Sequence, residues 1–395
     1  MKRFFSYSIL SFFLLLLPTG QASANNNDSI RLSLLTCAPG EEIYSLFGHT
    51  AIRYENSSQG IDVVFNYGLF SFNTPNFIFR FSLGETDYQL GATDYERFAA
   101  EYAFFGRSVW QQTLNLTDEE KTELIRLLQE NYRPENRAYR YNFFYDNCAT
   151  RPRDKIEESI AGKVIYPAEP QDGSLTFRDI VHQYCKGHPW ARFGIDLCIG
   201  SEADQPITQR QMMFAPFYLM DAFDGAQIKG DSIQRPLITA NELIVDATPE
   251  PDESDWMPTP LQCSLLLFIL TAAATIYGIR RRTGLWGIDL FLFGIAGIVG
   301  CVLAFLALFS QHPAVSSNFL LLVFHPGQLL FLPYIIYCVR KGKKCWYLTL
   351  NLAVLTLFIV LFPVIPQRFD FAVVPLALCL LIRSVSNLIV TSKKK

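Results

Sequence analysis

The sequence is poor in charge and in histidine. Charged residues make up 18% of the 395 positions, the formal net charge is −3, and five residues are histidine. The globular part has no basic stripe that could follow the phosphates of a nucleic acid, so nucleic-acid binding is excluded. Its histidines, His49, His182 and His188, do not combine with its cysteines at the spacing of a zinc site. We therefore expect no metal and no other cofactor.

Hydrophobic residues are abundant instead, at 50% of the chain, which is too apolar for an ordinary soluble enzyme. The first residues carry two basic side chains, then an apolar run, then small residues before position 25, which is typical of a signal peptide. A proline-rich acidic stretch separates a mixed globular region from a hydrophobic C-terminal part. The sequence predicts a signal peptide at 1–24, an exported domain at 25–246, a linker at 247–260 and a membrane domain at 261–395.

The membrane domain contains five hydrophobic stretches, each near the length that crosses about 30 Å of hydrocarbon. Clusters of arginine and lysine occupy alternate connections between the stretches. Because such clusters stay in the cytoplasm, the exported domain lies outside and the C-terminus inside. The predicted spans are 262–279, 285–309, 318–339, 346–363 and 371–390.

Two polar features interrupt these spans. The third contains His325-Pro326-Gly327-Gln328, and the fifth contains Arg383-Ser384. Either the polar groups pack against neighbouring helices, with Arg383 extending to the basic inner face, or they mark a path for lipid through the bundle.

A β-hairpin is predicted near the start of the exported domain. Residues 50–54 and 61–67 have strand-like patterns, and the turn residues 56–60 separate them. His49 at the start of the hairpin then lies opposite residues 67–69, which brings Asn66 or Tyr67 within reach of its ring. An imidazole that acts as a base needs such a partner to fix its tautomer.

A cysteine follows further along. Residues 117–131 read as a capped amphipathic helix, residues 139–145 as a strand, and residues 146–152 as the start of another helix. Cys148 then lies at a helix N-terminus, where the dipole, Arg151 and Arg153 favour the thiolate. A buried structural thiol is the alternative, but the polar setting favours a nucleophile.

Other residues leave two questions open. Cys185 and Cys198 are close enough in sequence for a disulfide, and they can equally be free thiols. His182 and His188 flank Cys185 and are expected to be surface or packing residues. The aromatic segment at 67–72, with Phe77, Phe79 and Phe81 behind it, suits either a core or a groove for acyl chains.

The order of a histidine on an early strand, a polar residue on the next and a cysteine that opens a later helix resembles the circularly permuted papain-like fold of the lecithin:retinol acyltransferase group. Four segments, 35–40, 47–53, 66–68 and 146–151, are similar to the Lnb-type bacterial lipoprotein N-acyltransferases. The resemblance implies an α+β exported domain with a permuted papain-like cysteine fold, followed by an all-α five-helix transmembrane bundle. It also implies a multi-pass protein of the bacterial inner membrane with its catalytic domain in the periplasm.

The resemblance further implies roles for three residues: Cys148 as nucleophile, His49 as its base and Asn66 as the residue that orients the histidine. An acyl chain would pass from a phospholipid to a Cys148 thioester, and then to the α-amino group of a diacylated lipoprotein. The permuted group often has a second histidine on the neighbouring strand, and this chain has none there. A cysteine hydrolase, acting as a phospholipase or cell-wall peptidase, and a non-catalytic envelope scaffold are the alternatives.

Overall fold

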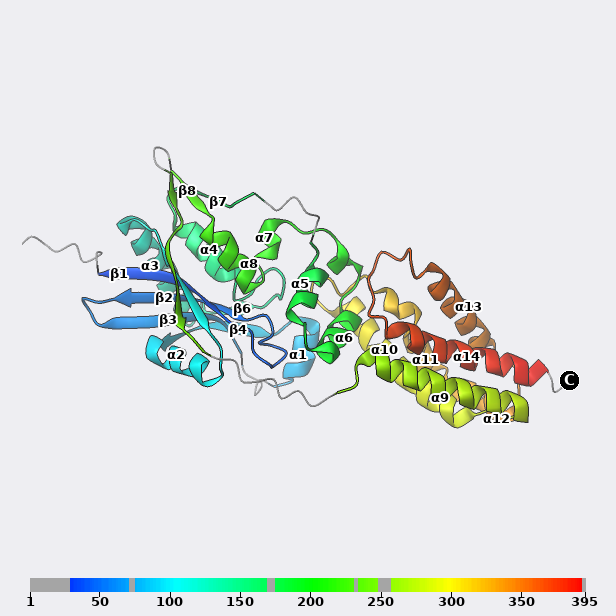
Figure 1. The fold of residues 1–395 in the computed structure, drawn as a ribbon. Coiled ribbons are helices and arrows are strands. Elements are labelled where there is room, and N and C mark those ends of the chain that lie inside the picture. The colour runs from blue at the N-terminus through cyan, green and yellow to red at the C-terminus, as the bar shows by residue number, and fades with distance from the viewer. Residues whose placement is uncertain (1–28, 71–74, 169–174, 231–233, 248–256, 393–395) are drawn as a thin grey trace, which may run out of the picture.

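The computed structural model describes residues 29–70, 75–168, 175–230, 234–247 and 257–392. The predicted signal peptide at 1–24 and most of the predicted linker at 247–260 lie outside the described residues. The described chain forms an α+β sheet domain followed by a group of apolar helices, which point away from the sheet in Figure 1.

The sheet domain is built on seven antiparallel strands in the order β10-β5-β1-β2-β3-β4-β6. Both faces of the central strand are buried: Leu32 and Leu34 enter one hydrophobic core, and Leu35 and Cys37 enter the other. The sheet is therefore covered by helices on both sides. The strands are β1 (Ile30–Cys37), β2 (His49–Asn56), β3 (Ile61–Leu69), β4 (Asp87–Asp94), β5 (Val109–Leu114), β6 (Ala138–Arg140) and β10 (Ile238–Val245).

The predicted hairpin is confirmed as β2 and β3, and the predicted strand at 139–145 is shorter than expected. It ends at Arg140, because the next residues turn back on themselves. Asn142 pairs with Asp146 in an isolated bridge, and the Asn142 carboxamide accepts the backbone N–H groups of Phe144 and Tyr145. Such a side-chain bond to the backbone competes with a strand.

Short helices surround this sheet. The predicted helix near 117–131 is confirmed as α3, and Thr117 and Glu120 form a capping box at its start. The helices are α1 (Phe77–Leu83), α2 (Tyr95–Phe104), α3 (Asp118–Tyr132), α4 (Thr150–Ser159), α5 (Phe177–Tyr184), α6 (Pro189–Cys198), η1 (Ser201–Asp204), α7 (Gln209–Met212) and α8 (Pro216–Asp224). A second, three-stranded sheet contains β7 (Lys163–Ile165), β8 (Gln227–Lys229) and β9 (Gln234–Pro236).

The C-terminal helices follow the five predicted hydrophobic stretches, but they are not five equal spans. Within the described residues, α9 (Pro260–Arg281), α10 (Trp286–Phe309) and α14 (Val373–Ser392) are long and apolar enough to cross a membrane. The third stretch divides into η2 (Phe319–Leu322), α11 (Pro326–Leu330) and α12 (Leu332–Lys341), with a bend of 73°. The fourth, α13 (Trp346–Leu361), has 16 residues and rises only about 24 Å.

The predicted polar cluster lies at the break between η2 and α11, a few residues before the bend at Phe331 between α11 and α12. The Gln328 carboxamide donates to the Val323 carbonyl at 2.7 Å, which satisfies a backbone group that the break leaves open. Gly297 and Gly300 on α10 let the broken segment approach closely, because a Cβ atom on either would lie 2.4 Å from backbone atoms of Leu329 or His325. These contacts support packing against neighbouring helices as the role of the cluster.

Arg383 does not extend to the inner face. Its side chain is 2% exposed, and its guanidinium binds the Asp289 carboxylate of α10 at 2.7 and 3.0 Å. A third bond goes to the Thr275 hydroxyl of α9 at 3.0 Å. A buried charge needs such partners, so Arg383 joins three helices inside the bundle.

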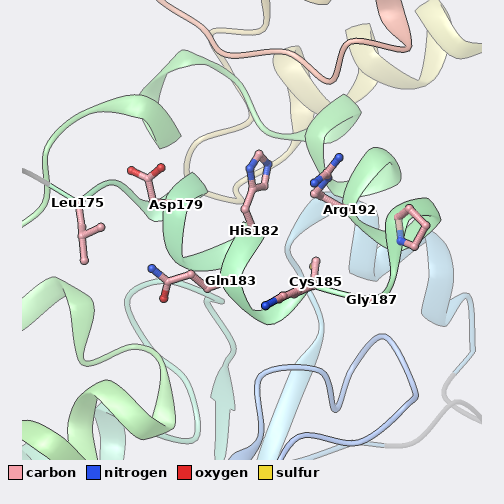
Figure 2. A pocket seen from close by; sticks show the side chains of 9 residues that line it. Leu175, Asp179, His182, Gln183, Cys185, Gly187 and Arg192 are labelled. Atoms are coloured by element: carbon pink, nitrogen blue, oxygen red, sulfur yellow. The ribbon is translucent and has the colours of Figure 1, made fainter. Parts of the chain in front are cut away.

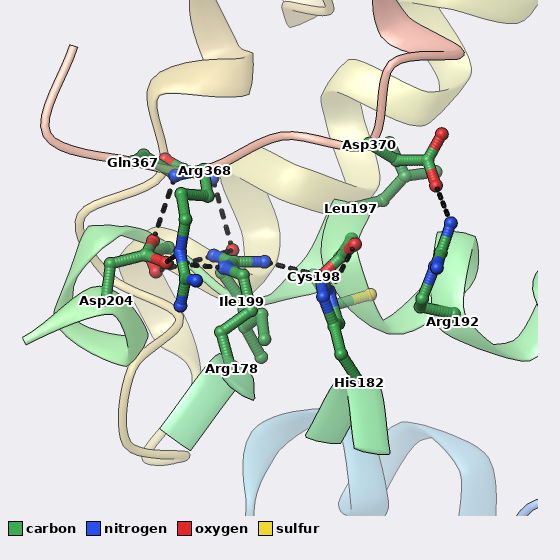
Figure 3. Close-up of polar contacts among 12 residues, drawn as sticks. Arg178, His182, Arg192, Leu197, Cys198, Ile199, Asp204, Gln367, Arg368 and Asp370 are labelled. Carbon is green, nitrogen blue, oxygen red and sulfur yellow. Dashed lines mark hydrogen bonds and ion pairs between the residues drawn. The ribbon is translucent and has the colours of Figure 1, made fainter. Parts of the chain in front are cut away.

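The sheet domain is fixed to the membrane helices through α5, α6 and the loop that precedes α14 (Figure 3). Arg368 from that loop binds Asp179 at 2.5 Å and Asp204 at 2.8 Å. Arg192 binds Asp370 at 3.2 Å, and the Gln367 carboxamide donates to the Ile199 carbonyl at 3.2 Å. These bonds hold the sheet domain in one orientation above the bundle.

Candidate active site

Cys148 lies in the short loop between the Asn142–Asp146 bridge and α4, as the predicted helix start requires. The preceding residue, Asn147, holds this loop. Its carboxamide oxygen accepts the backbone N–H groups of Ala149 at 2.8 Å and Thr150 at 2.9 Å, and its nitrogen donates to the Phe143 and Phe214 carbonyls at 2.8 and 2.9 Å. Asn147 is 3% exposed. It thus binds backbone N–H groups at the start of α4 and holds the thiol one residue before the N-cap, Ala149.

His49 is the first residue of β2, and its partner is Asn66 on β3. The His49 Nε2 atom lies 3.2 Å from the Asn66 Oδ1 atom. Tyr67, the other predicted candidate, donates its hydroxyl to Asn131 instead. Because a carboxamide oxygen only accepts, Nε2 carries the hydrogen and Nδ1 keeps its lone pair free.

The thiol and this hairpin are in contact. The backbone N–H groups of Thr50, which follows His49, and of Cys148 itself lie close enough to the thiol to lower its pKa. On β3, a Cβ atom on Gly68 would lie 3.6 Å from the Cys148 Cβ atom. The fold therefore brings Cys148 to the strand pair that carries His49 and Asn66, although about a hundred residues separate Cys148 from His49.

The expected thiolate is not what the structure favours. Burial raises the pKa of the Cys148 thiol to about 11, and the two backbone N–H groups offset this only in part. The arginines that were expected to lower it have other partners, because Arg151 binds Asp146 at 2.6 and 2.8 Å and Arg153 binds Asp154 at 2.9 Å. Near neutral pH the thiol keeps its proton.

His49 is also uncharged near neutral pH. Burial lowers its pKa from 6.5 to about 4, the hydrogen bond with Asn66 opposes the change, and the charge of Arg107 adds to it. Cys148 and His49 each remain half-buried, so a substrate can reach them. A thiol and an imidazole that are both neutral can exchange a proton during nucleophilic attack and need no ion pair beforehand.

Aromatic side chains surround the thiol, and the sequence analysis did not single them out for this role. Tyr141 Cε2 lies 3.9 Å and Tyr139 Oη 4.0 Å from the same Cβ position on Gly68 that adjoins Cys148. Tyr141 stacks on Tyr88 with 4.2 Å between the ring centroids. The buried Tyr139 hydroxyl has no hydrogen-bond partner within the described part of the chain. Gly68 has a positive φ of 93°, which favours glycine at this position beside the thiol.

The other cysteines of the sheet domain do not resemble Cys148. Cys37 also has a pKa raised by burial, to about 12, but unlike Cys148 it is fully buried within β1, where no substrate can reach it. Cys185 and Cys198 are both free, so the structure contains no disulfide between them.

His182 has a packing role, because its Nε2 atom lies 2.9 Å from both carboxylate oxygens of Asp196. His188 lies 3.8 Å from Glu41.

An open groove of about 440 Å³ lies between α5 and α6 (Figure 2). It is separate from Cys148, and three polar side chains on its wall, Asp179, His182 and Arg192, already bind Arg368, Asp196 and Asp370. The groove is therefore part of the junction between the two domains.

Among the residues that the structure describes, no group of three or more histidine, cysteine or acidic side chains could hold a metal ion.

Two family matches cover most of the chain. Residues 20–182 match the family described as the Lnb N-terminal periplasmic domain, and residues 252–395 match the Lnb transmembrane domain. Cys148, His49 and Asn66 all lie inside the first match. No curated protein and no solved structure gives a match.

Proposed function

The chain belongs to the Lnb family and is a membrane protein with a periplasmic domain, and on this basis we propose that it is a lipoprotein N-acyltransferase of the bacterial inner membrane. It transfers an acyl chain from a phospholipid, through a thioester on Cys148, to the α-amino group of a diacylated lipoprotein. The observation that carries the proposal is the thiol of Cys148 at the start of α4, against the strand pair on which Asn66 holds His49. The order of these residues along the chain suits a permuted papain-like domain.

In the first step, the Cys148 sulfur attacks the ester carbonyl of the phospholipid, and the thiol proton passes to His49 Nδ1. Asn66 keeps the ring oriented through Nε2. The oxyanion that forms accepts hydrogen bonds from the nearby backbone N–H groups and from the Tyr139 hydroxyl, which has no other partner in the described chain. The C–O bond then breaks, His49 returns the proton to the departing oxygen, and lysophospholipid leaves an acyl thioester on Cys148.

In the second step, the neutral α-amino group of the lipoprotein attacks the thioester carbonyl. His49 accepts one amine proton and delivers it to the sulfur as the C–S bond breaks, so the free thiol is restored and an amide is formed. A thioester is far more reactive toward amines than the parent ester. This sequence needs no metal or cofactor, and none enters the proposal.

Substitution of the two reacting residues tests the proposal. We expect Cys148→Ser and His49→Ala to abolish N-acylation while the protein still inserts in the membrane with unchanged thermal stability. Mass spectrometry of a lipoprotein N-terminus gives the readout. Cys198→Ser is the matched control, because Cys198 is a half-buried free thiol away from the site. Normal N-acylation by either active-site variant contradicts the proposal, and release of free fatty acid in place of acyl transfer would identify a hydrolase.

A further inference from the structure

The short helix α1 exposes an apolar surface that the sheet domain does not cover. Ile78 is 79%, Phe79 57% and Phe81 45% exposed, and the helix has no buried residue. A soluble domain rarely leaves three large apolar side chains together on one helix, and such a cluster marks a partner or a membrane. The core interpretation of Phe79 and Phe81 is therefore excluded.

The contacts of α1 show at which depth it lies. Phe79 packs on Phe305 of α10, with 5.7 Å between the ring centroids. The His312 ring bonds the Phe81 carbonyl at 2.6 Å, and the Gln311 backbone N–H donates to the Leu83 carbonyl at 2.8 Å. Figure 1 shows α1 at the end of the sheet domain that faces the membrane helices.

Phe305 lies about one turn, or roughly 6 Å, from the end of α10 at Phe309. Phe309 itself is 64% exposed on the surface of an apolar span. The ring of Phe79 therefore reaches the boundary between headgroups and hydrocarbon, where interfacial helices insert their apolar faces by about 5–10 Å. The partner of this surface is the outer leaflet of the bilayer that surrounds α10.

A continuous row of aromatic rings connects α1 with Cys148. Phe81 stacks on Phe77 at 6.1 Å, and Phe77 stacks on Phe70 at 5.7 Å. Phe70 contacts Tyr88 at 5.1 Å, and Tyr88 stacks on Tyr141 at 4.2 Å. Tyr141 Cε2 and the Cys148 Cβ atom both lie within 4 Å of the Cβ position on Gly68, so the row ends beside the nucleophile.

We propose that α1 inserts into the outer leaflet and that this row of rings guides one acyl chain of an outer-leaflet phospholipid from the bilayer to Cys148. The inference rests on the proposed function, because it specifies how the acyl donor reaches the nucleophile. An acyl chain slides along aromatic and aliphatic surface without losing hydrogen bonds, since a hydrocarbon makes none. The phospholipid ester then stays near the membrane surface while its chain lies along the rings.

Photocrosslinking tests the position of α1 without any acyl transfer. Benzoylphenylalanine replaces Phe79 in the full-length Cys148→Ala protein, in vesicles of phosphatidylethanolamine and phosphatidylglycerol. We expect crosslinks to phospholipid acyl chains. The matched control places the same group at Phe104, a 79% exposed phenylalanine on α2, which lies farther from the membrane helices than α1 in Figure 1. Equal labelling at both positions, or none at Phe79, overturns the inference and leaves the role of Cys148 intact.

Charge substitution tests the route in the active protein. Ile78→Glu with Phe79→Glu places carboxylates in the membrane boundary, and we expect at least a tenfold lower rate of Cys148 acylation with the unfolding temperature of the wild type. Phe104→Glu is expected to acylate Cys148 at the wild-type rate. A wild-type rate in the double variant overturns the route. The crosslinks do not depend on the thiol, so they are expected even if Cys148 is not the nucleophile. Failure of the catalytic proposal would instead appear as no acylation of Cys148 in the wild type.

Discussion

At the scale of single residues, the site depends on uncharged partners. Burial keeps the Cys148 thiol protonated and His49 neutral, with pKa values of about 11 and about 4. Asn66 determines which ring nitrogen can accept the thiol proton. The turn length fixes the hairpin register, so the sequence narrowed the partner of His49 to Asn66 or Tyr67, and the structure selects Asn66. It could not predict the pKa values, since they depend on burial and on which carboxylates bind Arg151 and Arg153.

The lowered pKa of His49 predicts how stability depends on pH. The unfolded chain binds a proton at His49 below about pH 6.5, whereas the folded chain binds it only near pH 4. As far as it depends on His49, the free energy of unfolding is therefore at its full value above pH 6.5. It falls by up to about 3 kcal/mol as the pH drops toward 4. We expect the free energy of unfolding of His49→Gln, measured in urea between pH 4 and 7, to lack this fall toward low pH. An identical pH dependence in wild type and variant would show that His49 titrates normally.

Tyr139 allows a second test at this scale. Its hydroxyl is buried without a partner in the described chain, so Tyr139→Phe should leave the free energy of unfolding unchanged or raise it by up to about 1 kcal/mol. If the hydroxyl donates to the oxyanion, thioester formation slows by about 100-fold. Tyr67→Phe is the control, because its hydroxyl binds Asn131: it should lose stability and keep the rate. A wild-type rate for Tyr139→Phe would remove the hydroxyl from the mechanism.

At the scale of elements, local signals predicted the hairpin and the start of α3, but not the length of β6 or the division of the third and fourth hydrophobic stretches. The capping residues of α3 and the turn of the β2–β3 hairpin are encoded within a few neighbouring positions. The break before α11 was visible as Pro326-Gly327, but the bend of 73° at Phe331 was not, because glycines on α10 shape the surface against which this segment packs. Asp289 was missed, since its partner Arg383 is distant in sequence.

The ion pair between α10 and α14 gives a prediction for the helices. Asp289→Leu leaves the Arg383 charge buried without its carboxylate, which should cost about 3–5 kcal/mol and lower the unfolding temperature in detergent. The double variant Asp289→Leu with Arg383→Leu removes both charges and should recover most of that loss. If the double variant is as unstable as the single one, the contacts of the pair between the helices stabilise the bundle beyond neutralising a buried charge.

At the scale of the whole molecule, the sheet domain and the membrane helices act together. The route proposed for the acyl chain requires α1 to stay against α10 while Cys148 stays above the bilayer. Arg368 and Arg192 hold another part of the junction through Asp179, Asp204 and Asp370. Composition could predict two domains and their sides of the membrane, but not this junction, whose partners come from distant segments.

Loss of the junction should make the sheet domain more mobile. Arg368→Ala removes charge-assisted hydrogen bonds from Asp179 and Asp204, each worth about 1.5–3 kcal/mol before solvent screening at this half-exposed arginine reduces it. We expect amide hydrogen exchange in α5 and η1 to rise about tenfold, with slower acyl transfer. Arg126→Ala, which breaks an exposed pair with Glu123 on α3, should change neither. Unchanged exchange in Arg368→Ala would show that other contacts suffice.

The central claim is that Cys148 carries the acyl chain between donor and acceptor. The most direct measurement is the mass of the peptide that contains Cys148 after the protein has been incubated with phospholipid vesicles and no acceptor. We predict an added acyl group on Cys148, absent in His49→Ala, which disappears when a diacylated lipopeptide is added and reappears on its α-amino group. An unmodified Cys148 peptide, together with an N-acylated lipopeptide product, would contradict the account.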